Sequence, residues 1–195
     1  MRIISGSKRG ALLEVPQGGK VRPTADRVRE GLFNILGSGR YGDVLASPVI
    51  ADVFSGVGSL GFESWSRGNL KSGAPHIIFI EQDQDALHAL NLNIKKLNLG
   101  DSATVIKRDA TKKLIWPAGK ANLVFLDPPW IHHDDDDDLA LMALENLIAL
   151  DALEGGAFIS IEHDYRRPAQ LPESCKVLDT RKWGKTACTF ARYED

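Results

Sequence analysis

The amino-acid sequence predicts an α/β domain built on a mainly parallel β-sheet. From Pro48 onward, short β-prone runs alternate with segments of helical periodicity. The first of these runs leads through a glycine-rich turn into a helix. The chain has 195 residues, of which 43% are hydrophobic. A domain of about this size buries roughly 70% of its unfolded surface, which is enough for one core and a cleft.

Five strands and three helices are expected in this part of the chain. The strands are expected at residues 49–54, 76–81, 104–107, 122–126 and 157–161. The helices are expected at residues 60–67, 83–97 and 138–150. Two more strands, near residues 176–182 and 186–193, are joined by a tight turn and predict an antiparallel C-terminal hairpin.

The N-terminal part follows a different pattern. Two β-prone pieces, residues 2–5 and 12–15, flank a turn-like stretch and predict a hairpin. Apolar residues at spacings of three and four then predict a helix over residues 25–35. We therefore expect an N-terminal hairpin extension over residues 1–20 and a main domain over residues 21–195.

Charge is unevenly distributed along the chain, although the net charge is only −2. The first 40 residues carry eight of the 24 Lys and Arg and three of the 26 Asp and Glu; the other 155 residues carry 16 and 23. This asymmetry suits a basic segment that contacts phosphates beside an acidic body that holds something cationic.

The cysteines and the N-terminus bear on the compartment. Cys175 and Cys188 have no CxxC spacing and no nearby histidine pair, so neither a disulfide framework nor a zinc site is indicated. The N-terminal residues lack the apolar stretch of a signal peptide, and no run approaches the roughly 18 apolar residues that span a bilayer. A soluble, cytoplasmic protein is expected.

The turn after the first strand, Gly56-Val57-Gly58-Ser59-Leu60-Gly61, matches the GxGxxG pattern of cofactor-binding loops. The match alone is weak, since a tight strand-to-helix turn also uses glycines. Asp52 and Glu81 strengthen the match, because they lie at or near the carboxyl ends of two strands. In an open sheet these strand ends line one crevice. A carboxylate at Asp52 would repel the pyrophosphate of NAD and attract the cationic tail of S-adenosylmethionine.

Asp109 follows the third expected strand. It is placed to hydrogen-bond an adenine amino group, and with equal weight to cap the segment that starts at Thr111.

The fourth expected strand stops at Asp127-Pro128-Pro129-Trp130. Two prolines cannot continue a central strand, so the chain leaves the sheet in a stiff loop. This loop presents the Asp127 carboxylate and the Pro128 carbonyl as fixed acceptors beside the flat face of Trp130. Two acceptors that grip an exocyclic amino group make its nitrogen a better nucleophile, and Trp130 offers stacking to an unstacked base. The alternative is a proline turn with Trp130 packed in the core.

Beyond the glycine and Asp-Pro-Pro motifs, the sequence resembles a known family over nearly its full length, the bacterial small-subunit (16S) ribosomal RNA guanine-N2 methyltransferases of the RsmD type. The resemblance rests on the segments Met1-Arg2-Ile3-Ile4-Ser5-Gly6, Arg9-Gly10, Arg22-Pro23-Thr24, Asp26-Arg27-Val28-Arg29-Glu30 and Leu32-Phe33-Asn34. It implies the Rossmann-like class I fold with a seven-stranded sheet, S-adenosylmethionine as methyl donor, and a guanine N2 in 16S ribosomal RNA as acceptor.

The residues of each site are then assigned on this basis. The catalytic loop is Asp127, Pro128, Pro129 and Trp130. The expected cofactor-binding residues are Thr24, Asp52, Phe54, Gly56, Gly58, Gly61, Glu81, Gln82, Asp109 and Ala110. The expected RNA-binding residues are Lys8, Arg9, Arg22, Arg27, Arg29 and Lys185. For about half of the three arginines Arg22, Arg27 and Arg29, the alternative is a solvated helix face with intrahelical ion pairs. A monomer acting on a partly assembled small subunit is expected, without a metal site.

Two features depart from the family. Trp130 stands where members commonly have Tyr or Phe, which keeps the stacking face and changes the pocket size. The run His132-His133 followed by five aspartates, residues 134–138, is unusual beside an RNA site, and we interpret it as a solvated loop rather than a metal site.

Three other functions stay open from the sequence. They are an amino-group methyltransferase for adenine or cytosine in DNA or another RNA, an NAD-dependent oxidoreductase, and a catalytically silent RNA-binding assembly factor. Asp52 disfavours the oxidoreductase, and the short chain leaves little room for a DNA sequence-reading domain.

Overall fold

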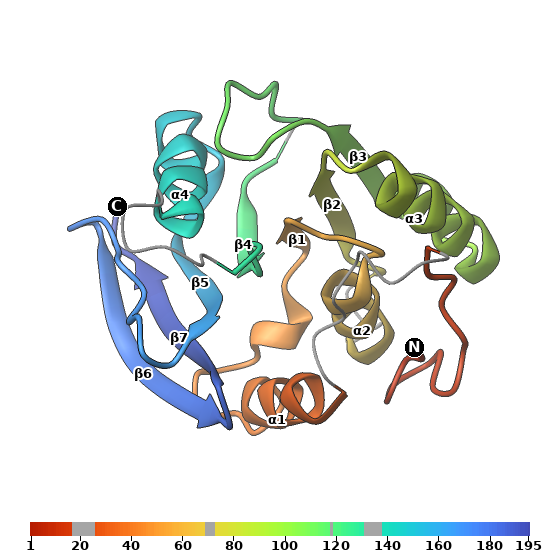
Figure 1. Ribbon diagram of the computed structural model, residues 1–195, viewed down its shortest axis with the longest axis horizontal. Helices are drawn as coiled ribbons and strands as arrows, with labels where there is room; N and C mark the ends of the chain where they lie inside the picture. Colours follow the sequence, from red (N-terminus) through yellow and green to blue (C-terminus); the bar gives the residue numbers. More distant parts are fainter. Residues whose placement is uncertain (17–25, 69–72, 118, 131–137) are drawn as a thin grey trace.

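The computed structural model describes residues 1–16, 26–68, 73–117, 119–130 and 138–195. Its centre is a seven-stranded sheet with the order β3-β2-β1-β4-β5-β7-β6 (Figure 1). The strands are β1 (Val49–Val53), β2 (His76–Glu81), β3 (Ala103–Lys107), β4 (Ala121–Leu126), β5 (Leu153–Asp164), β6 (Cys175–Trp183) and β7 (Thr186–Tyr193). β1 to β5 pair in parallel and β7 pairs antiparallel with both β5 and β6, so the predicted α/β class and C-terminal hairpin are confirmed.

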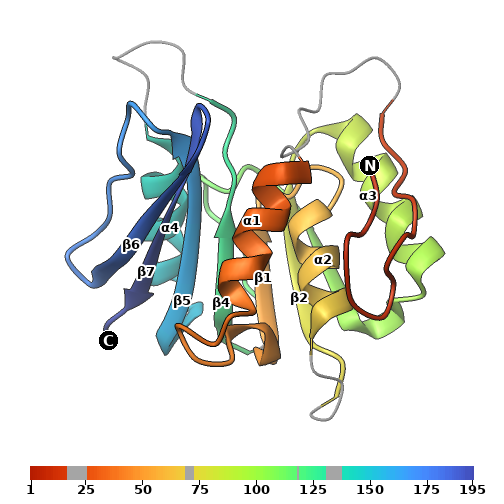
Figure 2. The ribbon, with the colours of Figure 1, turned by 90° about the horizontal axis from the view of Figure 1, so that it is seen from below.

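Helices cover both faces of the sheet (Figure 2). They are α1 (Asp26–Leu36), α2 (Ser59–Arg67), α3 (Gln84–Leu97) and α4 (Leu139–Ala149), with short 3-10 turns at Val44–Ala46 and Gly100–Ser102. Buried residues of α1, α2 and α3 form one apolar cluster with β-strand side chains. Those of α4 form a second cluster on the other face. Strand residues alternate between the two clusters, as the side-chain period of two requires.

Two helix starts are set by aspartate caps that the predicted boundaries had placed inside the helices. The side chain of Asp83 accepts a hydrogen bond from the Ala86 amide at 2.9 Å, and that of Asp138 accepts one from Leu141 at 3.0 Å. A carboxylate at this position satisfies a free amide of the first turn and complements the helix dipole. The end of α3 is likewise confirmed, since Asn98 adopts a left-handed conformation with φ 61°.

The N-terminal segment lies across α2 and α3 as part of the same core. Ile3 and Leu13 are buried in the cluster that contains α1 to α3. The expected hairpin is present in short form: Arg2 and Leu12 form a bridge pair, and the amides of Ile3 and Leu13 donate to the carbonyls of Ala11 and Met1 at 3.0 and 3.1 Å. The segment is also held by Glu63 of α2, which accepts the amides of Ile4 at 2.7 Å and Ser5 at 3.0 Å. The expected boundary near residue 20 lies outside the described residues.

Strand order reverses between β1 and β4. β1 pairs with β2 on one side and with β4 on the other, while the chain crosses over from β3 to β4. The loops that follow β1 and β4 therefore diverge toward opposite faces and leave a crevice between them at the carboxyl ends. This is where the glycine turn and the Asp-Pro-Pro loop both begin.

Gly61 tests the packing of α2 against this sheet. A Cβ at Gly61 would lie 2.6 Å from Phe79 Cε1 and 3.0 Å from Asp52 Oδ2. We expect Gly61→Ala to lower the free energy of unfolding by about 1–3 kcal/mol, because the extra methyl overpacks a filled site. Urea denaturation measures it. Gly155→Ala is the control, because its Cβ would meet only Asp195 Cβ at 3.7 Å; equal midpoints for the two variants would contradict the packing argument.

Candidate active site

The turn after β1 is shaped by residues in the left-handed region. Phe54 has φ 60°, Gly56 φ 55° and Gly58 φ 86°. The Ser55 amide donates to the Ile80 carbonyl at 3.0 Å, and the Gly58 amide donates to the Ser55 carbonyl at 2.8 Å. A Cβ at Gly58 would lie 2.5 Å from Phe62 Cε2, so both backbone angle and space select glycine there. The tight turn predicted from the glycine motif is thus present.

Asp52 supports this turn from below. Its side chain is 1% exposed, and Oδ2 accepts the Gly61 amide at 2.8 Å. Burial raises the pKa of Asp52 well above its ordinary value of 3.8, the Gly61 hydrogen bond opposes that rise, and the charges of Asp127 and Glu81 add to it. Asp52 therefore lies beneath the turn and holds α2 in position, and a cationic ligand in the crevice would favour its ionised form.

Glu81 connects the ends of β1 and β2. Its Oε2 accepts the Gly56 amide at 2.7 Å, and its Oε1 accepts the amides of Gln82 at 2.7 Å and Asp83 at 2.8 Å. A carboxylate has about four lone-pair sites, so these three bonds fix its orientation and leave about one site for a ligand hydroxyl. Glu81, which the sequence predicts as a cofactor-binding residue, thus also holds the glycine turn.

The residues after β3 are engaged within the protein. Asp109 Oδ1 accepts both the amide of Thr111 at 2.9 Å and its hydroxyl at 2.7 Å, which favours the capping alternative. Ala110 is buried, and its carbonyl accepts the Asn146 amide at 2.9 Å. The Ala110 carbonyl is thus bonded to a side chain of α4. Both hydrogen bonds within the Asp109 turn use Oδ1.

Asp127 lies between the cofactor crevice and a neighbouring cavity. Its amide donates to the Val53 carbonyl of β1 at 3.4 Å, across the point where strand order reverses. Its charge contributes to the raised pKa of Asp52 on one side. It also contributes, after burial and Glu162, to the raised pKa of the buried Cys188 thiol on the other. Asp127 therefore lies close enough to act on buried groups on both sides of the reversal point.

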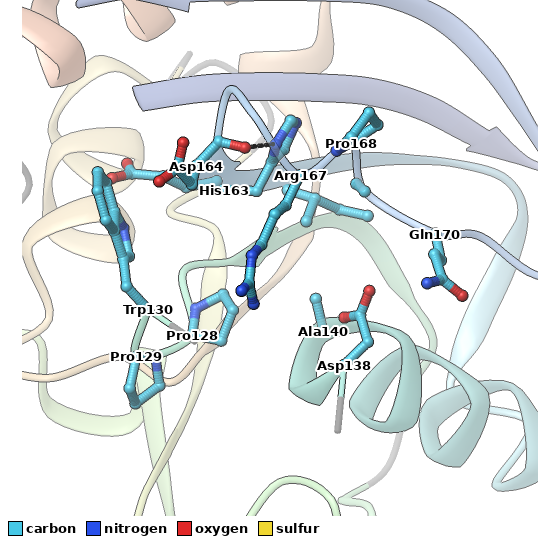
Figure 3. A pocket seen from close by; sticks show the side chains of 13 residues that line it. Pro128, Pro129, Trp130, Asp138, Ala140, His163, Asp164, Arg167, Pro168 and Gln170 are labelled. Carbon is cyan, nitrogen blue, oxygen red and sulfur yellow. Dashed lines mark hydrogen bonds between the residues drawn. The ribbon is translucent and has the colours of Figure 1, made fainter. Parts of the chain in front are cut away.

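The loop after Asp127 forms one wall of a cavity of about 330 Å³ (Figure 3). The remaining walls come from the start of α4, the end of β5 and the segment that follows β5. Its lining residues are Pro128, Pro129, Trp130, Asp138, Ala140, Ile161, Glu162, His163, Asp164, Arg167, Pro168, Ala169 and Gln170. Trp130 is half-buried rather than enclosed in the core, which favours the functional interpretation of this loop over the packing one. The Arg167 side chain extends toward Pro128 (Figure 3).

Most walls of this cavity were missed by sequence reasoning. The polar residues at the end of β5 match no motif, and only the register of the sheet places them beside Asp127. Leu126 pairs with Ile161 across β4 and β5, so Glu162 is the next residue opposite Asp127. A strand end that becomes polar was the available signal, because in parallel sheets such ends line ligand sites.

The predicted RNA-binding residues differ in their placement. Arg9, Arg27 and Lys185 are exposed, and Lys8 is half-buried with its amine 5.8 Å from the centre of the Trp65 ring. Arg22, like the cofactor candidate Thr24, lies outside the described residues, as do residues 131–137 of the acidic loop.

The prediction for Arg29 is wrong. Its side chain is fully buried, and Nη2 donates to the Arg2 carbonyl at 2.7 Å and to Asp26 Oδ1 at 2.8 Å. Burial also lowers the pKa of Arg29, with the charge of Asp26 opposing that shift. The N-terminal segment covers the helix face that the sequence pattern suggested was solvated, so Arg29 anchors that segment and is not available to a phosphate.

Among the described residues, no group of three or more His, Cys, Asp or Glu side chains could hold a metal ion. Cys175 and Cys188 are buried free thiols. No helix in the described ranges is both long and apolar enough to cross a membrane.

The sheet order, the glycine turn with its two acids and the Asp-Pro-Pro loop at the reversal point together define a class I methyltransferase fold. A family model described as "Conserved hypothetical protein 95" matches residues 1–192, and the chain belongs to that family. The predicted membership is thereby confirmed, since a relative in Haemophilus influenzae named "Ribosomal RNA small subunit methyltransferase D" is 33% identical over 187 residues, 94% of this chain and 89% of that protein.

Other relatives agree. "Putative rRNA methyltransferase YlbH" of Bacillus subtilis is 37% identical, covering 93% of this chain and 92% of its own. The solved structure described as putative methyltransferase yhhF from Escherichia coli is 30% identical with a TM-score of 0.78, covering 100% of this chain and 98% of that one. The solved structure of a putative methylase from H. influenzae is 30% identical with a TM-score of 0.75, covering 100% of this chain and 99% of that one. The predicted Rossmann-like methyltransferase architecture is confirmed.

Asp52→Asn tests the electrostatic role of the buried acid. A protein with such a buried acid loses stability as pH rises above 3.8, because the unfolded chain then ionises the group while burial favours its neutral form in the folded state. The variant keeps a side-chain acceptor for the Gly61 amide and lacks this loss. We therefore expect its melting temperature to gain on the wild type between pH 4 and pH 7, measured by scanning fluorimetry without cofactor.

The same variant should bind S-adenosylmethionine roughly tenfold more weakly by calorimetry, a ratio that corresponds to about 1.4 kcal/mol. A parallel pH dependence for both proteins would contradict the burial argument, and unchanged affinity would contradict the charge argument.

Proposed function

We propose that this protein transfers a methyl group from S-adenosylmethionine to the exocyclic N2 of a guanine in small-subunit (16S) ribosomal RNA. The observation that carries the proposal is the position of Asp127-Pro128-Pro129-Trp130 at the reversal point, with the cofactor crevice on one side and a cavity of about 330 Å³ on the other. The names of the family relatives given above support ribosomal RNA as the substrate.

The cofactor side suits S-adenosylmethionine better than a dinucleotide. Asp127 and Glu81 both act electrostatically on the buried Asp52, so three acidic side chains lie close together at the strand ends. A pyrophosphate would be repelled, whereas a sulfonium and an ammonium group are attracted. Glu81 would hold the ribose hydroxyls, and the main chain of the glycine turn would lie against the methionine portion. When bound, the cofactor supplies an electrophilic methyl group on sulfur.

The acceptor side positions and activates the amino group. The Asp127 carboxylate and the Pro128 carbonyl accept hydrogen bonds from the two N–H groups of N2. These bonds localise the nitrogen lone pair and direct it toward the methyl group. Trp130 stacks on the base after it leaves its helix, a contact typically worth about 1–3 kcal/mol. After the N–C bond forms and the C–S bond breaks, the methylated nitrogen carries a positive charge. Its excess proton leaves to Asp127 or to water.

The RNA partner is inferred from charge and from the relatives. Lys8, Arg9, Arg27 and Lys185 supply exposed or half-buried cations from the N-terminal segment, α1 and the C-terminal hairpin. The proposed substrate is a partly assembled small subunit. The protein would bind it in the cytoplasm as a monomer. The competing oxidoreductase would bind NADH in calorimetry in preference to S-adenosylmethionine.

Asp127 variants separate the acceptor role from a role as base. We expect Asp127→Ala to abolish tritium transfer from S-adenosylmethionine to undermodified small subunits, with cofactor affinity kept within a few-fold. Asp127→Asn keeps a side-chain oxygen acceptor without a basic site, so it should keep a measurable part of the rate. Near-normal turnover in Asp127→Ala would show that the loop is only structural, and equal loss in both variants would favour Asp127 as the base.

Salt dependence tests the RNA-binding residues. We expect Arg9→Ala, Arg27→Ala and Lys185→Ala each to weaken RNA association. Each should also reduce the slope of log affinity against log salt by roughly 0.7–0.9 for every phosphate that the side chain no longer neutralises. Lys120→Ala is the matched control, because Lys120 precedes β4, at the amino ends of the parallel strands, and pairs with Asp151. Slopes equal to that of the wild type would exclude these residues as phosphate ligands.

A further inference from the structure

The cavity beside the Asp-Pro-Pro loop contains a second carboxylate in register with Asp127. Glu162 is 8% exposed and lines the cavity together with Pro128 and Trp130. It follows Ile161, whose pairing partner Leu126 precedes Asp127. Both carboxylates also act on the same buried thiol, Cys188 of β7, which pairs with Glu162 across β5 and β7. This register would let a base whose amino group is held at Asp127 present its neighbouring ring atom to Glu162.

Three other polar side chains of the cavity, which Arg167 and Gln170 also line, make contacts within the protein. The Asp138 carboxylate caps α4 through the Leu141 amide at 3.0 Å. Asp164 is paired with Arg166 at 2.6 Å. The His163 ring lies 2.9 Å from the Asp164 carbonyl through Nδ1 and 2.9 Å from the Thr189 hydroxyl through Nε2. Among these acids and the histidine, Glu162 combines burial with a place directly beside the catalytic loop.

The ring atom next to the amino group differs among the bases. In guanine the neighbour of N2 on the Watson–Crick edge is N1, which carries a hydrogen. In adenine the neighbour of N6 is N1, and in cytosine the neighbour of N4 is N3; neither carries a hydrogen, and both are acceptors. A carboxylate at this point accepts a hydrogen bond from guanine and repels the lone pair of the other two.

We propose that Glu162 is the residue that selects guanine, by accepting the N1 hydrogen while Asp127 and Pro128 hold N2. This inference rests on the proposed function and adds a physical reason for its choice of base. The Glu162 carboxylate would distinguish this pocket from an adenine or cytosine site built on the same loop. A buried polar group that must pair with the substrate rejects analogues lacking the partner far more strongly than a hydrophobic wall does.

The test uses an analogue that keeps the amino group and lacks the neighbouring hydrogen. In 2,6-diaminopurine N2 is present, N1 is an acceptor and an amino group replaces O6, so the Glu162 variant is needed to assign the preference to N1. After the methylated position is mapped, this base is placed there in small-subunit RNA by ligation of a synthetic fragment. Single-turnover tritium transfer then compares it with guanine. For the wild type we expect guanine to react roughly 100-fold faster.

Glu162→Gln should lower the rate with guanine roughly tenfold and reduce the preference for guanine over 2,6-diaminopurine by a similar factor, because its amide can donate to N1. Glu154→Gln, the same change at an exposed position near the start of β5, should keep both values. Calorimetry with S-adenosylmethionine and a melting curve establish that the Glu162 variant is folded.

The outcomes separate the two levels of inference. If the wild type reacts with 2,6-diaminopurine within threefold of guanine, or if Glu162→Gln leaves the preference unchanged, Glu162 does not select the base while guanine methylation stands. If the wild type transfers no methyl group to guanine N2 at all, the proposed function itself fails. If the variant does not fold, wild-type rates with guanine and 2,6-diaminopurine that agree within threefold still contradict the proposal.

Discussion

The hydrogen bond between the buried Asp52 carboxylate and the Gly61 amide is the contact on which the site depends. It fixes the first turn of α2 against the end of β1 and leaves no room for a side chain at Gly61. The cost is a carboxylate without solvent, reflected in its raised pKa, beside two further acids. A cationic ligand bound in the crevice, as we propose for S-adenosylmethionine, would offset that cost.

The same edge of the sheet organises the acceptor side. Four carboxylates lie within two residues of the carboxyl ends of neighbouring strands: Glu81, Asp52, Asp127 and Glu162, in the order β2, β1, β4 and β5. In the proposed reaction, the acids near the glycine turn face the donor and those beyond the reversal point face the base. Asp127 lies between the two groups, so this row of acids would bind a cation on one side and accept hydrogen bonds from guanine on the other.

The alternation of strands and helices was predictable because each element buries a distinct face with its own period. Predicted and observed strand limits for β2, β4 and β7 agree to within one residue. β5 was predicted too short, since Gly155-Gly156 hides its start and the polar Glu162-His163-Asp164 hides its end. Glu63 and Asn93 were missed because a polar residue inside a helix gives no sign of its partner. Glu63 holds the N-terminal segment, and Asn93 joins Glu14 to the carbonyl of Val57 in the glycine turn. Arg29 was misjudged for the same reason, as its partner lies 27 residues away.

The atom that receives the methyl group distinguishes guanine methylation from every alternative. The most direct measurement is tritium transfer from S-adenosylmethionine to undermodified small ribosomal subunits, followed by digestion to nucleosides and chromatography. We predict that the label appears as N2-methylguanosine. Label in a methylated adenosine or cytidine, or transfer that requires neither Asp127 nor the cavity beside it, would contradict the central claim.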